Sequence, residues 1–166
     1  ADGYFVLPYT IGDYLSKDIS TGPIPNDSKE FLSAEEEVKE KIKFFVSNNG
    51  SKSVDYFHKK LGKIMWNKCG MARTKETLKE AIDEISGLRK EFYKDVKVPG
   101  SSDQFNEELA KAGRVSDFLE LGELFAKDAL QREESCGGHF REEYQTPEGE
   151  AKRRKEFQYV SAWEYK

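Results

Sequence analysis

Apolar residues recur at spacings of three and four between residues 34 and 134, and this period predicts four helices. The predicted helices cover residues 34–47, 54–69, 75–96 and 104–134. Short loops join the last three, which is typical of antiparallel neighbours in a bundle. The pattern therefore predicts an all-α domain, in which one extra helix precedes an antiparallel three-helix bundle similar to a spectrin repeat.

Residues able to cap a helix stand before each predicted helix. Ser33 is followed three residues later by Glu36, which is the spacing of a capping box. At the other starts, a side-chain oxygen would accept a backbone N–H of the first turn in a similar way. These further predicted N-caps are Ser53, Thr74 and either Ser102 or Asp103.

The N-terminal residues fall outside the helical pattern. Residues 3–16 are aromatic and apolar, but Pro8 and Gly12 predict an interruption of any long helix. Two interpretations remain open: a segment that packs on a partner, or a first strand or short helix that covers the domain's own core. Residues 17–33 hold prolines, glycine and turn formers from Thr21 onward, which predicts a linker.

The C-terminal residues change to a period of two, which predicts a strand. A lone strand is not stable in water, so the segment must pair or lie across helices. We therefore predict either a strand or an extended arm. The alternating residues are Phe157, Tyr159, Ser161, Trp163 and Tyr165.

Composition narrows the possible functions. The 166 residues carry a formal net charge of -4, which makes nucleic acid an improbable partner. The basic residues 152–155 are flanked by glutamates and are interpreted as a solvated helix face. Two cysteines are too few for a disulfide scaffold and fit a reducing compartment. The chain does not begin with methionine, so we expect a piece of a longer protein.

The stretch 131–146 is the strongest candidate for chemistry or for a special structural role. Cys136 and His139 could ligate a metal, but zinc needs about four ligands and the remaining candidates, His58 and Cys69, are scattered. Cys136 as a nucleophile would need a base and a third group that orients it, and only His139 is near in sequence. A metal site and a catalytic site are therefore both disfavoured.

A structural interpretation of the same stretch fits its glycines and charges better. Gly137 and Gly138 have no phosphate-loop context and predict a helix C-terminus at which a positive φ is needed. Arg132 and Arg141 are the candidates for specific contacts, because a guanidinium can bind a carboxylate or backbone carbonyls through several donors. The residue types and their spacing therefore favour a structural role for this stretch over a catalytic one.

Residues 132–144 resemble the R-x-E-S-R-G-x-H-x-R-x-D-Y motif of the flavoprotein subunits of succinate dehydrogenase and fumarate reductase, with L-aspartate oxidase as a relative. Cys136 replaces the usual arginine, Gly138 the usual small residue and Glu143 the usual aspartate. The resemblance extends over about residues 54–166. The matching motif residues are Arg132, Glu134, Ser135, Gly137, His139, Arg141 and Tyr144.

The resemblance implies a division of the chain and a role for it. Residues 1–33 would be the remnant of the helix that closes an FAD domain plus a linker, and residues 34–166 a C-terminal helical domain with its arm. The whole subunit would hold FAD and interconvert succinate and fumarate. It would pass electrons to an iron–sulfur subunit on a membrane anchor, at the cytoplasmic face of the membrane.

The resemblance also implies that this chain contributes structure instead of chemistry. No catalytic, cofactor-binding or metal-binding residue of the family can be placed on it, and the GxGxxG fingerprint is absent. The seven matching residues would form a network that docks the bundle on the FAD domain. The rival interpretations are an L-aspartate oxidase domain, or a free-standing interaction module whose binding residues are Tyr4, Phe5, Tyr9, Trp163 and Tyr165.

Overall fold

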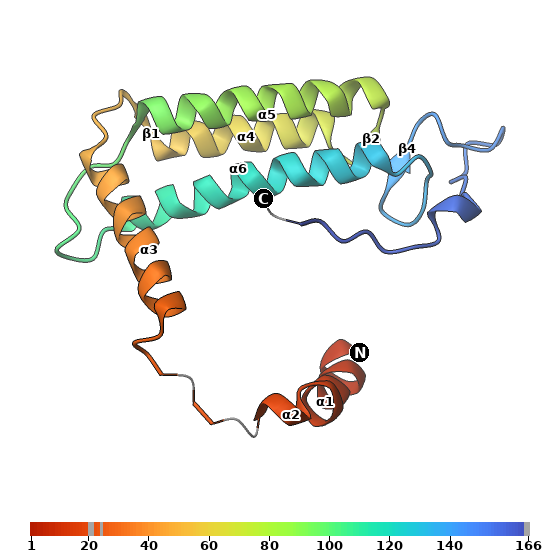
Figure 1. Cartoon of the computed structure of the whole chain (residues 1–166). Coiled ribbons are helices and arrows are strands. Elements are labelled where there is room, and N and C mark those ends of the chain that lie inside the picture. Colours follow the sequence, from red (N-terminus) through yellow and green to blue (C-terminus); the bar gives the residue numbers. More distant parts are fainter. Residues whose placement is uncertain (20–21, 24, 165–166) are drawn as a thin grey trace. The chain divides into compact units, whose positions relative to one another are not determined.

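The computed structural model of the protein describes residues 1–19, 22–23 and 25–164 (Figure 1). Thr21 of the predicted linker and Tyr165 of the predicted strand lie outside these ranges. The chain divides into two compact units, residues 1–40 and 41–166, which are described separately.

The N-terminal unit begins with helical turns. The π turn η1 (Asp2–Val6), α1 (Leu7–Tyr9) and the π turn η2 (Thr10–Tyr14) follow one another, and α2 (Ser16–Ile19) comes next. Pro8 has no backbone N–H to donate, and the turns on both sides of α1 are wider than α turns. The segment is helical, so the first-strand form is wrong. Its packing, on a partner or over the domain's own core, stays a prediction.

Helix α3 (Lys29–Ser47) begins five residues earlier than a start after Ser33 would require, so that predicted cap is wrong. The Leu32 N–H donates to the Ser28 carbonyl at 3.1 Å, so the first helical hydrogen bond is already made there. Within the second unit, α3 buries Phe45, which is only 1% exposed. The predicted apolar face is confirmed at this end of α3 only, since Val38 is 57% exposed.

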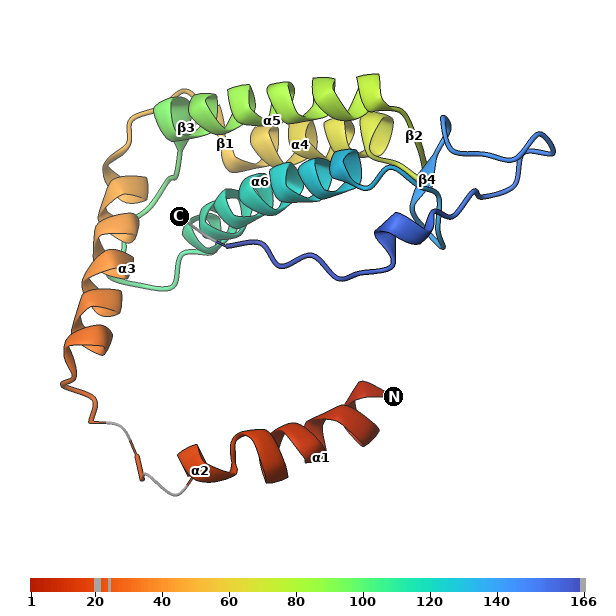
Figure 2. The ribbon, with the colours of Figure 1, turned by 45° about the vertical axis from the view of Figure 1, so that its right-hand side comes forward.

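The second unit contains the predicted three-helix bundle (Figure 2). Helices α4 (Val54–Lys68), α5 (Lys75–Asp95) and α6 (Glu107–Gln131) run antiparallel to their neighbours in sequence. The Ser53 hydroxyl accepts the Tyr56 N–H, and a capping box joins Thr74 and Thr77, so both predicted caps are confirmed. The core members from these helices are Val54, Phe57, Leu61, Ile64, Leu78, Ala81, Ile85, Leu88, Phe92, Ala112, Val115, Leu119, Ala126 and Ala129.

Helix α6 starts later than predicted, because its N-cap is Asn106 and neither Ser102 nor Asp103. The Asn106 side-chain oxygen accepts the Leu109 N–H at 3.0 Å. Its side-chain nitrogen donates to the carbonyls of Pro99 and Ser101, so one amide fixes both the preceding loop and the helix start. At Gly122, a Cβ would already touch α4 side chains at 3.4 Å, which permits α4 and α6 to pack closely.

Two short parallel strand pairs close the ends of the bundle. Strand β1 (Lys52–Ser53) pairs with β3 (Val96–Lys97). Strand β2 (Ala72–Arg73) pairs with β4 (Phe140–Arg141), with Arg73 opposite Arg141. The second pair brings the segment after α6 against the connection between α4 and α5, and this end of the bundle carries the candidate site.

The C-terminal segment forms no strand over its described residues, so that alternative is wrong and the extended arm is the form observed. A 3₁₀ turn, η3 (Lys155–Phe157), precedes irregular backbone up to residue 164. The arm is held to α6 by the Trp163 indole, which donates to Asp128 at 2.9 Å. The segment with the two-residue period has no partner strand among the described residues, and a side-chain contact holds it instead.

Candidate functional site

The motif residues lie in the segment that follows α6. Cys136 and His139 exchange two backbone hydrogen bonds, of 2.8 and 3.1 Å, and so close a tight turn around the glycine pair. Gly137 has the positive φ that was predicted, at 59°. The pair does not end the helix, however, because α6 stops at Gln131 and its C-cap Arg132 is already extended. The predicted helix end at the glycines is therefore wrong.

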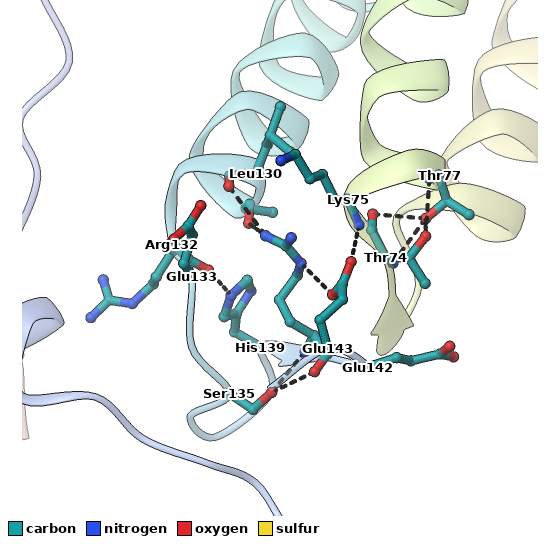
Figure 3. A network of polar contacts seen from close by, with 12 residues as sticks. Thr74, Lys75, Thr77, Leu130, Arg132, Glu133, Ser135, His139, Glu142 and Glu143 are labelled. Carbon is teal, nitrogen blue, oxygen red and sulfur yellow. Dashed lines mark hydrogen bonds and ion pairs between the residues drawn. The ribbon is translucent and has the colours of Figure 1, made fainter. Parts of the chain in front are cut away.

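Arg141 is the centre of the site and is only 1% exposed. Figure 3 shows the polar network at this end of the bundle, with Ser135, His139 and Glu143 labelled. Its Nη1 donates to the carbonyls of Ala129 and Leu130, each at 3.1 Å. These carbonyls belong to the last turn of α6, where no helical N–H remains to satisfy them. The guanidinium therefore caps the helix and places a positive charge at the negative end of its dipole.

Glu143 extends this contact to a second helix. Its carboxylate accepts Arg141 Nε at 3.1 Å and also the backbone N–H of Lys75, the first residue of α5. Burial alone would raise the pKa of Glu143, but the donors from Lys75, its own backbone and Arg141 outweigh burial and lower it. One ion pair thus connects the end of α6 to the start of α5.

Ser135 holds the backbone of Arg141 in place. Its fully buried hydroxyl accepts the Arg141 N–H at 2.8 Å and donates to the Arg141 carbonyl at 3.0 Å. The Ser135 N–H itself donates to the carbonyl of Lys152. The serine therefore fixes both β4 and the approach of the C-terminal segment.

Glu134 and Arg132 bind the C-terminal segment from the other side. Glu134 is 3% exposed and accepts Arg132 Nε at 3.0 Å and the Arg154 N–H at 2.9 Å. Arg132 also donates to the carbonyl of Phe157 at 2.7 Å. The interpretation of residues 152–155 as a solvated helix face is wrong about the helix, because residues 152–154 lie in irregular backbone. Lys152, Arg153 and Lys155 are exposed, whereas Arg154 is half-buried and belongs to this network.

His139 is held as a neutral ring. Its Nε2 lies 2.8 Å from the Arg132 carbonyl, and since a carbonyl only accepts, Nε2 carries the proton. Burial lowers the pKa of His139, and the nearby charges of Arg73, Arg141 and Arg132 lower it further. The ring therefore serves as a hydrogen-bond donor in this structure.

Tyr144 completes the set of motif residues. The guanidinium carbons of Arg141 and Arg154 lie 5.5 and 5.7 Å from the centre of its ring, within cation–π range. Burial raises the pKa of its hydroxyl. All seven predicted motif residues are thus brought together at one end of the bundle.

The contacts described for the motif residues are hydrogen bonds, ion pairs and ring contacts within the chain. Among the described residues, no cluster of three or more His, Cys, Asp or Glu side chains could hold a metal ion. The Cys136 backbone is occupied in the turn, and Cys69 is a separate buried thiol. The sequence did not identify Arg73 and Arg154 as members of this site. Arg73 stands just before a predicted helix and Arg154 stands in a run of basic residues, and neither place indicates burial.

An apolar groove lies beside the site, between α4 and α6. One part, of about 680 Å³, reaches from Trp66 to Met71 and Ala72 at the edge of β2. A second part, of about 270 Å³, continues along Phe118 and Leu121. Both parts are lined by Gly62, Met65 and Phe125, so we treat them as one surface and name it the α4–α6 groove.

Known proteins match this chain over most of its length. The profile described as "Fumarate reductase flavoprotein C-term" matches residues 58–166. The fumarate reductase flavoprotein subunit of Haemophilus influenzae is 27% identical over 139 residues, which are 84% of this chain and 23% of that protein. The succinate dehydrogenase flavoprotein subunit of Rickettsia bellii is 33% identical over 97 residues, or 58% of this chain and 16% of that protein.

Solved structures agree with the sequence matches. "Quinol-Fumarate Reductase with Menaquinol Molecules" has a TM-score of 0.68 at 25% identity and covers 84% of this chain and 23% of its own. "Mycobacterium smegmatis Sdh1 complex in the apo form" has a TM-score of 0.63 at 27% identity, over 78% of this chain and 21% of its own. The chain therefore spans less than a quarter of the length of these proteins.

Proposed function

The chain belongs to the fumarate reductase flavoprotein C-terminal family, and from this membership we propose that it is the helical C-terminal domain of the flavoprotein subunit of a succinate/fumarate oxidoreductase. In that subunit, succinate and fumarate are interconverted and the electrons pass to an iron–sulfur subunit. The names of the relatives support this activity, since they are fumarate reductase and succinate dehydrogenase flavoprotein subunits.

We assign the FAD to the part of the subunit that precedes this domain in the longer relatives. The residues present here do not fit a flavin site. The donors of Arg132, Ser135, His139 and Arg141 are engaged in internal hydrogen bonds. The groove beside them is lined mainly by apolar side chains and holds no glycine-rich phosphate turn. No step of the reaction is therefore attributed to this domain.

The role we give the motif is to build a rigid docking end on the bundle. The observation that carries it is the buried network centred on Arg141, which ties the end of α6 to the start of α5 and, through Ser135, to the C-terminal segment. A network in which each member is satisfied favours one arrangement of the backbone. Such an end can present a fixed surface to the FAD domain and to the iron–sulfur subunit.

The same proposal places the subunit on the inner face of the membrane, attached only through its partners. Among the described residues, no helix is long and apolar enough to cross a membrane. In this proposal the membrane anchor belongs to another subunit of the complex.

The test begins with the natural protein that contains this sequence. We expect an intact mass several times the 19.1 kDa of this chain, bound FAD, and oxidation of succinate with an artificial electron acceptor. Oxidation of L-aspartate in place of succinate would move the protein to the L-aspartate oxidase interpretation. A natural product near 19.1 kDa would refute the oxidoreductase assignment for this molecule.

That last outcome would favour the second candidate, a free-standing interaction module. The observation in its favour is the aromatic N-terminal segment, in which Tyr4 is 84%, Tyr9 74% and Tyr14 82% exposed. Exposed aromatic residues gathered on a short segment often mark a binding surface.

A further inference from the structure

The α4–α6 groove exposes more apolar surface than a solvated helix face requires. Trp66 is 85%, Met71 79% and Leu121 61% exposed, and all three line the groove. Exposed apolar patches bounded by polar residues commonly mark protein interfaces. This surface is continuous across α4, α6 and the edge of β2.

Arg73 adds an unsatisfied polar group at the same edge. It is 6% exposed, and its Nε has no hydrogen-bond partner within the described part of the chain. The hydrogen bond from its Nη1 to the Cys69 carbonyl is long at 3.4 Å. A buried donor without an acceptor is costly, so such groups usually meet a partner in the functional state.

The position of Arg73 connects it to both the groove and the motif. Its guanidinium carbon lies 5.3 Å from the ring centre of Phe125, which lines both parts of the groove. Through β2, Arg73 is also paired with Arg141 of the buried network. The motif therefore shapes the groove indirectly, by holding β2, which includes Ala72, and the preceding Met71 in place.

We propose that the α4–α6 groove, with Arg73 at its edge, is the face that receives the flavin-binding part of the subunit, through an apolar segment that brings a carboxylate to Arg73. This inference rests on the proposed function. The occupant follows from the length of the relatives: this chain matches a C-terminal region and covers 23% of the Haemophilus influenzae protein. In a subunit of that length, the part that precedes this domain would be large and directly connected. The carboxylate follows from the charge and the free donor of Arg73.

Two variants of the native subunit test the groove and the arginine separately. Leu121→Glu places a charge on a side chain that is exposed in the isolated chain, so the isolated chain should fold and melt as before. In the native subunit the same charge would be buried, and we expect docking to weaken by roughly tenfold or more. Phe105→Glu is the matched control, because Phe105 is 90% exposed and does not line the groove.

Arg73→Gln should weaken docking as well, whereas Arg73→Lys should restore part of it by keeping the charge. Docking is read by protease cleavage between the two parts and by oxidative footprinting of Trp66. We expect Trp66 to react readily in the isolated chain and to be protected in the native subunit. Equal reactivity in both, or groove variants that behave like Phe105→Glu, would overturn the inference.

The same experiment separates this inference from the proposed function. A native subunit that holds FAD and oxidises succinate, but leaves Trp66 reactive, would refute the groove alone. A native protein without flavin or succinate oxidation would refute the proposed function, while the Trp66 footprint would still report whether the groove is covered.

Discussion

Replacing Arg141 with alanine should destabilise the second unit more than any exposed substitution on it. The change deletes two hydrogen bonds to the last-turn carbonyls of α6 and the ion pair with Glu143. It also leaves a cavity, because Arg141 is 1% exposed.

The expected loss of stability depends on the kind of contact that each partner makes with Arg141 and on how far that partner is buried. Hydrogen bonds from a charged donor contribute about 1.5–3 kcal/mol each, but the two carbonyls share one nitrogen and do not add fully. The Glu143 side chain is 35% exposed, so its share is screened by solvent and small. We expect a loss of about 3–5 kcal/mol in the free energy of unfolding, from these hydrogen bonds together with the cavity that the buried side chain leaves.

The assay is urea unfolding of the 166-residue chain followed by far-ultraviolet circular dichroism, with Arg114→Ala on α6 as an exposed control. The control should change stability by less than about 0.5 kcal/mol. Arg141→Lys should recover only part of the loss, since lysine lacks the planar fork that reaches the α6 carbonyls and Glu143 together. If Arg141→Ala cost less than about 1 kcal/mol, comparable to one ordinary neutral hydrogen bond, the buried network would not organise this end of the bundle.

Three further predictions address other parts of the second unit. Because burial lowers the pKa of His139, the imidazole binds a proton more readily in the unfolded chain than in the folded one, so the free energy of unfolding should rise with pH up to about 6.5. The variant His139→Gln can still donate to the Arg132 carbonyl but does not titrate. It should therefore flatten that rise in unfolding measurements between pH 5 and 6.5. Thr74→Ala removes the capping box of α5 and should cost about 1 kcal/mol in urea, whereas an unchanged midpoint would mean that the cap is dispensable. Gly50→Ala would bring a Cβ to 2.1 Å from the Asp95 carbonyl oxygen, so thermal melting should show a loss of about 1–3 kcal/mol in the free energy of unfolding. A variant that melts like the wild type would contradict this close approach.

The helices of the bundle could be predicted closely from the sequence. The predicted ranges 54–69 and 75–96 differ from α4 and α5 by one residue at their C-terminal ends. Their caps, Ser53 and Thr74, were also identified, because a cap bonds backbone groups only two or three residues away. The start of α6 was missed, since the Asn106 amide is selected by carbonyls of the preceding loop as well as by the helix.

The candidate site could be located from the sequence but not assembled from it. The motif pointed to residues 132–144, and the positive φ of Gly137 was anticipated within them. The partners of Arg141 were not anticipated. It caps α6 through carbonyls eleven and twelve residues earlier, and it pairs through β4 with Arg73. The burial of Arg141 could not be predicted, because it stands in a segment rich in charged residues, which are usually exposed.

The amino-acid sequence by itself determined the helical period, two of the three bundle caps and the family motif, because each depends on residues that are close together in the chain. Tertiary structure alone decided the parallel pairing of β2 with β4, the burial of Arg73 and Arg141, and the arm's contact with Asp128. These features join segments that are far apart in sequence. Which buried donor meets which carbonyl depends on how the helices pack, and no local pattern of residues specifies that arrangement.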